Sequence, residues 1–221
     1  MDGTKFAKAL VRLTKSYGRD LPAHISEDPG RVVIGCILSA RTRDERTDQA
    51  YASLFSTFPS LDLLCAASIE DLENLIKPVN FYRTKARKIK EAACYMLREL
   101  GGRIPRSRKE LMAIPGIGPK CADIVLSYAW GMDTVAVDTH VETVSKRLGV
   151  APPSAKYEEL KYRLERLAPP KFRSRVNDLF VVFGREVCTK SAPKCWMCPI
   201  YSLCEWKGKY QRKRKFTRQK R

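Results

Sequence analysis

The chain has 221 residues, of which 44% are apolar and 9% aromatic, and this is enough for one large or two small packed units. No segment approaches the roughly 20 consecutive apolar residues of a membrane span, and the opening MDGTKFAKALVR lacks the apolar centre of a signal peptide. We therefore expect a globular cytoplasmic protein rather than a membrane protein. In that reducing location the eight cysteines should be core residues or metal ligands rather than disulfides.

The charge is strongly basic, because 42 Lys and Arg against 24 Asp and Glu leave a net +18. Residues 207–221 hold nine basic residues and no acidic one, which predicts a basic, disordered tail. A basic tail suits a nucleic acid, a membrane surface or simple solubility. The other 206 residues still carry +9, and this favours a basic folded face and a polyanionic partner.

Apolar residues recur at helical spacing along almost the whole chain, so we predict an all-α fold. The runs VVIGCILSA and AYASLF, between Arg31 and Phe58, predict two helices joined by the polar RTRDERTD. Ser68 followed by Asp71 resembles a capping box at the start of a helix through Leu75. Two later helices should each bury one apolar stripe and end at a pair of helix-terminating residues. The first stripe is Ile89, Ala93, Met96, Leu97 and Leu100, and it ends at Gly101 and Gly102. The second is Leu160, Leu164 and Leu167, and it ends at Pro169 and Pro170.

The stretch IPGIGPK, residues 114–120, lies between two segments that both look helical, RSRKELMA and PKCADIVLSYAW. The pattern predicts a helix, a tight glycine turn and a second helix. Gly116 and Gly118 permit backbone angles closed to other residues, so that main-chain N–H groups of the turn can approach a DNA phosphate. We predict that Pro115, Gly116 and Gly118 contact DNA. The simpler alternative is an αα-hairpin with glycine at its corner.

Two residues near this stretch are candidate catalytic groups. Lys120 falls in the first turn of the second helix, where the positive end of the helix dipole disfavours an ammonium ion, and a neutral amine is a nucleophile. Asp138, in VAVDTH, ends an apolar approach at a helix start. The alternatives are a solvated surface lysine and an ordinary N-cap. A capping role is compatible with catalysis, since it would hold the carboxylate ionised and rigid.

Four cysteines form the strongest pattern in the chain: Cys188, Cys195, Cys198 and Cys204 have the spacing C-x6-C-x2-C-x5-C. Four thiolates so close in sequence can surround one metal centre. Zinc also takes four cysteines, but its structural sites more often show two short pairs, whereas a [4Fe-4S] cluster suits this compact loop. The other cysteines, Cys36, Cys65, Cys94 and Cys121, lie on apolar helical faces and are predicted core residues.

Together, IPGIGPK, VAVDTH and the cysteine spacing resemble the endonuclease III family of base excision DNA glycosylases, over about Lys8 to Trp206. The resemblance implies a two-lobed, all-α helix–hairpin–helix fold. One lobe would be a six-helix barrel at 22–134, with the helix–hairpin–helix at about 106–130. The other would combine 1–21 with 135–206 and carry a [4Fe-4S] cluster on the four cysteines.

By the same resemblance, Lys120 falls on the family's nucleophile and Asp138 on its catalytic aspartate. The damaged base would be flipped out of the duplex, and Lys120 would attack C1′ of its sugar to form a Schiff base that permits β-elimination. Asp138 would stabilise positive charge on the sugar. The cluster would brace a loop from which Lys190 and Lys194 meet phosphates. The implied partner is double-stranded DNA with a damaged or mismatched base, bound by a monomer in a prokaryotic, nucleoid-associated setting.

Two positions depart from the family's common residues. Arg41 stands in the loop after LSA, where glutamine is common, and Phe81 stands where leucine is common. Both positions line the gap left by a flipped base in the enzymes that the chain resembles. An arginine can offer a bidentate fork to an orphaned guanine, and Phe81 can act as an apolar wedge. The alternatives are a solvated arginine and a core phenylalanine.

Three functions follow. The favoured one is a glycosylase with apurinic/apyrimidinic lyase activity that removes oxidised pyrimidines. The second is a glycosylase for thymine or uracil mispaired with guanine, since arginine in this loop is similar to what such enzymes carry. The third is a DNA-binding protein with a structural metal and no catalysis, which would need neither Lys120 nor Asp138.

Overall fold

The computed structural model describes residues 1–18 and 28–210, and every regular element in these ranges is a helix. The predicted all-α fold is confirmed. The chain divides into two compact units. We call His24–Ala136 the hairpin unit, and Met1–Ala23 with Val137–Arg221 the cysteine-loop unit. No helix in the described ranges is long and apolar enough to cross a membrane.

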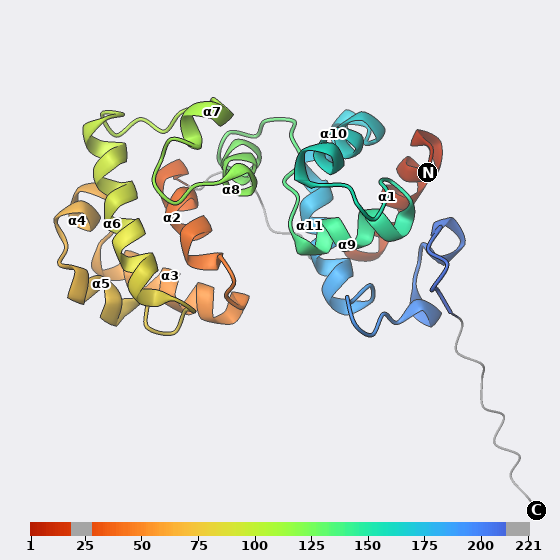
Figure 1. Cartoon of the computed structure of the whole chain (residues 1–221), viewed down its shortest axis with the longest axis horizontal. Helices are drawn as coiled ribbons and strands as arrows, with labels where there is room; N and C mark the ends of the chain where they lie inside the picture. The colour runs from red at the N-terminus through yellow and green to blue at the C-terminus, as the bar shows by residue number, and fades with distance from the viewer. Residues whose placement is uncertain (19–27, 211–221) are drawn as a thin grey trace, which may run out of the picture. The chain divides into compact units, whose positions relative to one another are not determined.

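The hairpin unit is organised around its longest helix, α6. Its helices are α2 (Pro29–Ser39), α3 (Asp44–Thr57), α4 (Leu61–Ala66), α5 (Ile69–Leu75), α6 (Tyr82–Arg98), α7 (Arg108–Leu111) and α8 (Pro119–Ile124), the last continued by a π-helical turn, η1 (Val125–Ala129). Helix α6 packs against α2, α4 and α5 (Figure 1). One apolar core runs through all of these helices, from Val32 in α2 to Leu126 in η1.

The ends of these helices follow the predicted signals. The Ser68 hydroxyl caps α5 by accepting a hydrogen bond from the Asp71 backbone N–H at 3.0 Å. Helix α6 is followed by Gly101 and Gly102, both with positive φ. Its predicted stripe is fully buried at Ile89, Ala93 and Met96 and partly buried at Leu97 and Leu100. The predicted pair of helices before Phe58 is present as α2 and α3.

The cysteine-loop unit combines the first helix of the chain with the last three. These are α1 (Gly3–Tyr17), α9 (Thr139–Leu148), α10 (Tyr157–Leu167) and α11 (Pro170–Glu186), followed by two short 3-10 turns, η2 (Cys195–Met197) and η3 (Tyr201–Leu203). Helix α11 contacts α1, α9 and α10. Phe6 of α1 and Phe180 of α11 are fully buried and meet edge to face, with ring centroids 6.2 Å apart.

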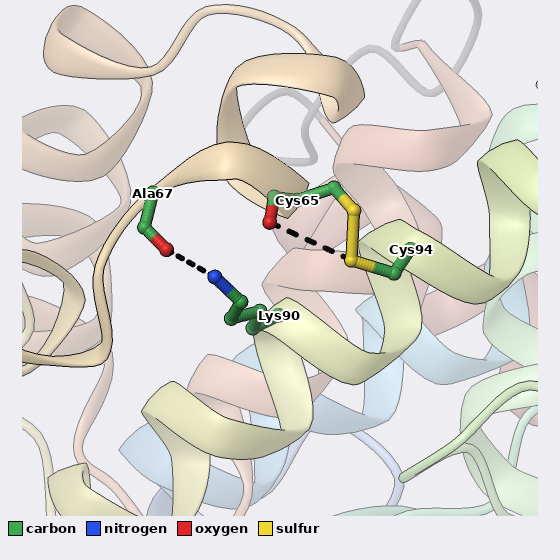
Figure 2. The surroundings of a disulfide bond; sticks show 4 residues. All are labelled: Cys65, Ala67, Lys90 and Cys94. Carbon is green, nitrogen blue, oxygen red and sulfur yellow. Dashed lines mark hydrogen bonds between the residues drawn. A yellow bond between two sulfur atoms is a disulfide. The ribbon is translucent and has the colours of Figure 1, made fainter.

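One prediction about the cysteines is wrong. Cys65 of α4 and Cys94 of α6 were expected to be separate core residues, but they form a disulfide and both side chains are half-buried (Figure 2). One turn before Cys94 in α6, Lys90 Nζ donates a hydrogen bond to the carbonyl oxygen of Ala67, the residue that follows α4 (Figure 2). Helix packing places the two thiols side by side, whereas the sequence shows only a separation of 29 residues.

The disulfide should contribute to stability. A double variant, Cys65→Ser with Cys94→Ser, should lose about 3.5 kcal/mol of unfolding free energy, because the open chain regains the entropy of a loop of about 30 residues. Urea titration would measure this loss. Reductant should lower the stability of the wild-type protein to that of the double variant and leave the variant unchanged. Equal stability of both proteins under oxidising conditions would contradict the prediction.

Candidate functional site

The glycine turn of the hairpin unit has the predicted geometry at Gly116. Its φ of +85° lies in the left-handed region, which other residues rarely adopt. Ile114 and Ile117 on either side are buried, and the Ile117 N–H donates to the Ile114 carbonyl oxygen at 3.1 Å. These two apolar anchors hold the turn against the core, while Gly116 itself is exposed.

Gly118 does not need its glycine for backbone conformation, and that part of the prediction is wrong. It is the N-cap of α8 with φ −104° and ψ −177°, an extended conformation open to any residue. A Cβ added there would meet no atom within 4 Å. Glycine at this position therefore leaves open space above the start of α8, and the backbone at the exposed Gly116 and the half-buried Gly118 can be approached closely.

A buried ion pair joins the two helices of the hairpin. Arg108 Nε of α7 lies 3.0 Å from Oδ1 of Asp123 in α8, and the Asp123 side chain is completely buried. A buried carboxylate without its partner would be costly, so this pair fixes the separation of α7 and α8. Sequence reasoning missed it, because neither residue stands out in a chain rich in charge.

Lys120 occupies the second position of α8, one turn after Gly116. Its side chain is half-buried, and among the described residues no hydrogen bond or ion pair engages its amine. The next residue, Cys121, was predicted to be a core residue, and its side chain is half-buried. A hydrogen bond with Cys36, aided by the nearby charge of Lys120, lowers the pKa of Cys121 to about 7. The start of α8 therefore places the free amine of Lys120 next to the easily ionised thiol of Cys121.

Asp138 is the N-cap of α9 in the cysteine-loop unit, as the pattern VAVDTH predicts. Its Oδ1 accepts hydrogen bonds from the backbone N–H groups of His140 at 2.9 Å and Val141 at 2.8 Å. Both bonds fall on the same oxygen, so Oδ2 has no hydrogen-bond partner within the described ranges. The carboxylate is held in one orientation with one oxygen available to another group.

The four cysteines of the predicted metal site lie together. Cys188, Cys195, Cys198 and Cys204 line one cavity of the cysteine-loop unit, closed by apolar neighbours such as Phe183 and Ile200. Burial, together with the neighbouring thiols, raises the pKa of Cys198 to about 11 and also raises the pKa of Cys188 and Cys204. Buried thiols of this kind keep their protons unless a metal replaces them.

Within residues 1–18 and 28–210, no set of three or more His, Cys, Asp or Glu side chains is arranged to bind a single metal ion. The four thiols around the shared cavity nevertheless have the chemistry of metal ligands, which zinc sites and iron–sulfur clusters both use.

Arg147, near the end of α9, holds the first part of this cysteine loop, residues 188–204. Its guanidinium donates to the carbonyl oxygens of Cys188 at 3.1 Å, Thr189 at 2.8 Å and Lys190 at 2.8 Å. The same group lies 3.4 Å from Cys188 Sγ, and Cys204 Sγ donates to the Arg147 carbonyl oxygen at 3.3 Å. One residue therefore ties the first and last cysteines to α9, and sequence reasoning did not identify it.

The predicted phosphate contacts and part of the predicted tail lie beside the cysteine loop. The side chains of Lys190 and Lys194 are exposed. Lys209 Nζ donates to the Cys204 carbonyl oxygen, and the Tyr210 hydroxyl donates to the Pro193 carbonyl oxygen at 2.7 Å. Residues 207–210 thus pack on the loop, contrary to the expectation that the tail begins at 207. Residues 211–221 lie outside the described residues.

The backbone turns that carry Arg41 and Phe81 lie next to each other in the hairpin unit. These are the two residues predicted to line the gap left by a flipped base. Asn80 Nδ2 donates to the Arg41 carbonyl oxygen at 2.6 Å. Both side chains are exposed, and Phe81 exposes 62% of its surface, so it is not the core residue of the alternative interpretation. Under these turns lies Lys85, which is only 5% exposed and donates to the Leu38 carbonyl oxygen at 2.6 Å.

Comparison with known proteins now identifies the family. The model of the HhH-GPD superfamily of base excision DNA repair proteins matches residues 34–170. The chain belongs to this superfamily of base excision DNA repair proteins. Within it, the chain is 39% identical to endonuclease III of Thermotoga maritima, over 83% of this chain and 85% of that protein. Endonuclease III of Escherichia coli is 30% identical, over 95% and 99% of the two chains. The predicted resemblance to the endonuclease III family is confirmed.

Solved structures agree with this assignment. A trapped endonuclease III–DNA covalent intermediate, an estranged-adenine complex, matches with a TM-score of 0.85 and 32% identity, covering 93% of this chain and 96% of that one. A thermostable thymine-DNA glycosylase matches with a TM-score of 0.82 and 24% identity, over 92% and 95% of the two chains, a likeness that concerns the fold alone.

Lys85 should give the protein a measurable pH dependence. Burial lowers its pKa from 10.5 to about 8, so between these values the unfolded chain holds a proton that the folded protein has lost. The free energy of unfolding should therefore rise with pH from about 8 to about 10.5, by at most about 1.4 kcal/mol per pH unit. Urea titrations at several pH values would measure the slope. Lys85→Met should remove this contribution, and an unchanged slope in that variant would contradict the assignment.

Proposed function

We propose that this chain is a DNA glycosylase with apurinic/apyrimidinic lyase activity that removes oxidised pyrimidine bases from double-stranded DNA in the cytoplasm of a prokaryote. The observation that carries the proposal is the free amine of Lys120 on the second helix of the hairpin. The relative captured as a covalent intermediate with DNA supports nucleophilic chemistry for this family member. A DNA-binding protein without catalysis would not need a half-buried amine kept free of ion pairs.

Lys120 is the proposed nucleophile. Once it has lost its proton, the amine attacks C1′ of the flipped nucleotide, and the N-glycosidic bond breaks as the base leaves with the bonding electrons and takes up a proton. Loss of a proton from the amine and opening of the sugar ring leave a Schiff base between Nζ and C1′. Removal of a C2′ proton then breaks the bond between C3′ and its oxygen, which cleaves the strand by β-elimination.

Asp138 is the proposed electrostatic partner. Because two backbone N–H groups hold Oδ1, the orientation of the carboxylate is fixed. The free Oδ2 can then stabilise the positive charge that develops on the sugar as the base departs.

Phosphate contacts would hold the duplex in register without reading its sequence. The exposed backbone at Gly116 and the open space at Gly118 suit close approach of a phosphate to main-chain N–H groups. Lys190 and Lys194, exposed on the cysteine loop, add positive charge in the other unit. Together these contacts would supply the part of the DNA-binding free energy that depends on salt concentration.

Cys188, Cys195, Cys198 and Cys204 would hold a [4Fe-4S] cluster, and the cluster when bound would supply cross-links that brace the loop. Arg147 orients the loop by binding three of its carbonyl oxygens. This bracing matters because the loop presents Lys190 and Lys194 on its outer side.

The catalytic roles can be separated by two substitutions. Lys120→Gln keeps the side-chain length but cannot attack, so it should abolish strand cleavage and borohydride trapping with an abasic duplex. Asp138→Asn keeps an oxygen for the cap but removes the charge, so it should slow single-turnover excision by about 10²- to 10⁴-fold. Gel assays on a thymine glycol duplex and an abasic duplex would measure both.

Melting curves and binding to undamaged duplex serve as controls, because both variants should fold and bind phosphate normally. Asp138→Ala, which removes the cap, should cost about 1 kcal/mol of stability in addition. Normal trapping by Lys120→Gln would contradict the lyase assignment.

The metal proposal predicts a yellow-brown protein with a broad visible absorption band and about four iron atoms per chain. Elemental analysis and absorption spectroscopy would measure both. Removal of the metal should unfold the cysteine-loop unit rather than slow catalysis alone, because the four cysteines surround the cavity that the cluster would fill. Stoichiometric zinc with no iron would contradict the cluster.

A further inference from the structure

Arg41 and Phe81 share an unusual backbone conformation. Their φ angles are +53° and +57°, and no other non-glycine residue in the described part of the chain has a positive φ. A left-handed conformation is rare for bulky residues and persists only where the surroundings enforce it. The two residues lie 40 positions apart in sequence, one after α2 and the other directly before α6.

Hydrogen bonds tie these two turns to each other. The Asn80 side chain binds the Arg41 carbonyl oxygen at 2.6 Å, and the Asn80 backbone N–H binds Thr42 Oγ1 at 3.1 Å. Both bonds start at Asn80, the residue before Phe81, and end at Arg41 or at the next residue, Thr42. The conformation of one turn therefore depends on that of the other.

The Thr42 hydroxyl is the centre of this network. It accepts from the Asn80 N–H and from Lys85 Nζ, the latter at 2.8 Å, and it donates to the Ala40 carbonyl oxygen at 3.4 Å. A hydroxyl has one proton to donate and two lone pairs, so all of its capacity is used. Lys85 also binds the last turn of α2 through the Leu38 carbonyl oxygen at 2.6 Å. The network is thereby anchored in the core of the hairpin unit.

The side chains that this network controls point away from the core. Phe81 is 62% exposed, the largest exposed fraction among the large hydrophobic side chains described, and Arg41 is exposed as well. Most of the Phe81 side chain is exposed to water, so packing within the protein does not explain its position. A phenyl ring and a guanidinium on two linked turns have the chemistry to enter an opened base stack, one by apolar insertion and the other by hydrogen bonding to a base edge.

We propose that Thr42, together with Asn80 and Lys85, acts as a set of positioning residues that holds Arg41 and Phe81 as one rigid two-pronged element for the gap left by the flipped nucleotide. Phe81 fills the gap and Arg41 faces the orphaned base. The inference rests on the proposed function and adds to it the residues that preorganise the element. Because these hydrogen bonds already fix the two backbone turns, inserting the side chains costs less conformational entropy than it would from two flexible turns.

A fluorescence experiment tests the positioning role separately from catalysis. The probe is a duplex with a tetrahydrofuran abasic analogue, which cannot be cleaved, opposite 2-aminopurine, whose fluorescence rises when it is unstacked. Wild-type protein and Thr42→Ser, which keeps the hydroxyl, should raise the fluorescence equally. Thr42→Val, of the same shape without hydroxyl, should give the low signal of Phe81→Ala and bind this duplex about tenfold more weakly. Binding of both Thr42 variants to undamaged duplex should remain at the wild-type level.

Asn80→Ala provides a second route, because the Asn80 side chain is exposed and its loss leaves the core intact. It should also lower the signal, and melting curves would show whether each variant is folded. Wild-type fluorescence in Thr42→Val and Asn80→Ala would overturn the proposal, as would the absence of any rise with the wild-type protein. If the wild-type protein unstacks the probe but cleaves no damaged duplex, the proposed function fails while the positioning role stands.

Discussion

The left-handed turn at Gly116 determines where the Lys120 amine, the proposed nucleophile, can lie. Because Ile114 and Ile117 are buried on either side, the turn cannot shift without exposing apolar surface. The buried pair of Arg108 with Asp123 then fixes α8 against α7. Lys120 follows within one turn of α8, so its position is set by backbone conformation and packing rather than by contacts of its own side chain.

Helix α9 has the corresponding role in the cysteine-loop unit. Asp138 caps its first turn, and Arg147 near its end binds the loop that carries the four cysteines. A single rigid helix thus connects the candidate electrostatic group with the candidate cluster. Under the proposed function, loss of a cluster from these cysteines would therefore disturb Asp138 through α9.

The sequence predicts those parts of the fold and site that depend on local spacing. The glycine turn, the cap at Ser68 and the clustering of the cysteines follow from short-range patterns. The Cys65–Cys94 disulfide and the bonds of Thr42 join residues about 30 to 40 positions apart, and helix packing alone creates them. Short-range patterns also have a limit, because a glycine-rich motif does not reveal which glycine has a backbone conformation closed to other residues. Gly118 has an ordinary extended conformation.

The central claim is that Lys120 forms the covalent bond to DNA. Its most direct test is peptide mapping of the borohydride-trapped adduct by mass spectrometry after nuclease and trypsin digestion. Modification of Lys120 blocks trypsin there, so the account predicts a sugar-phosphate remnant on one peptide spanning 110–146, with fragment ions that place the added mass on Lys120. An adduct on any other lysine, or on the N-terminal amine, with an unmodified peptide ending at Lys120, would contradict the account.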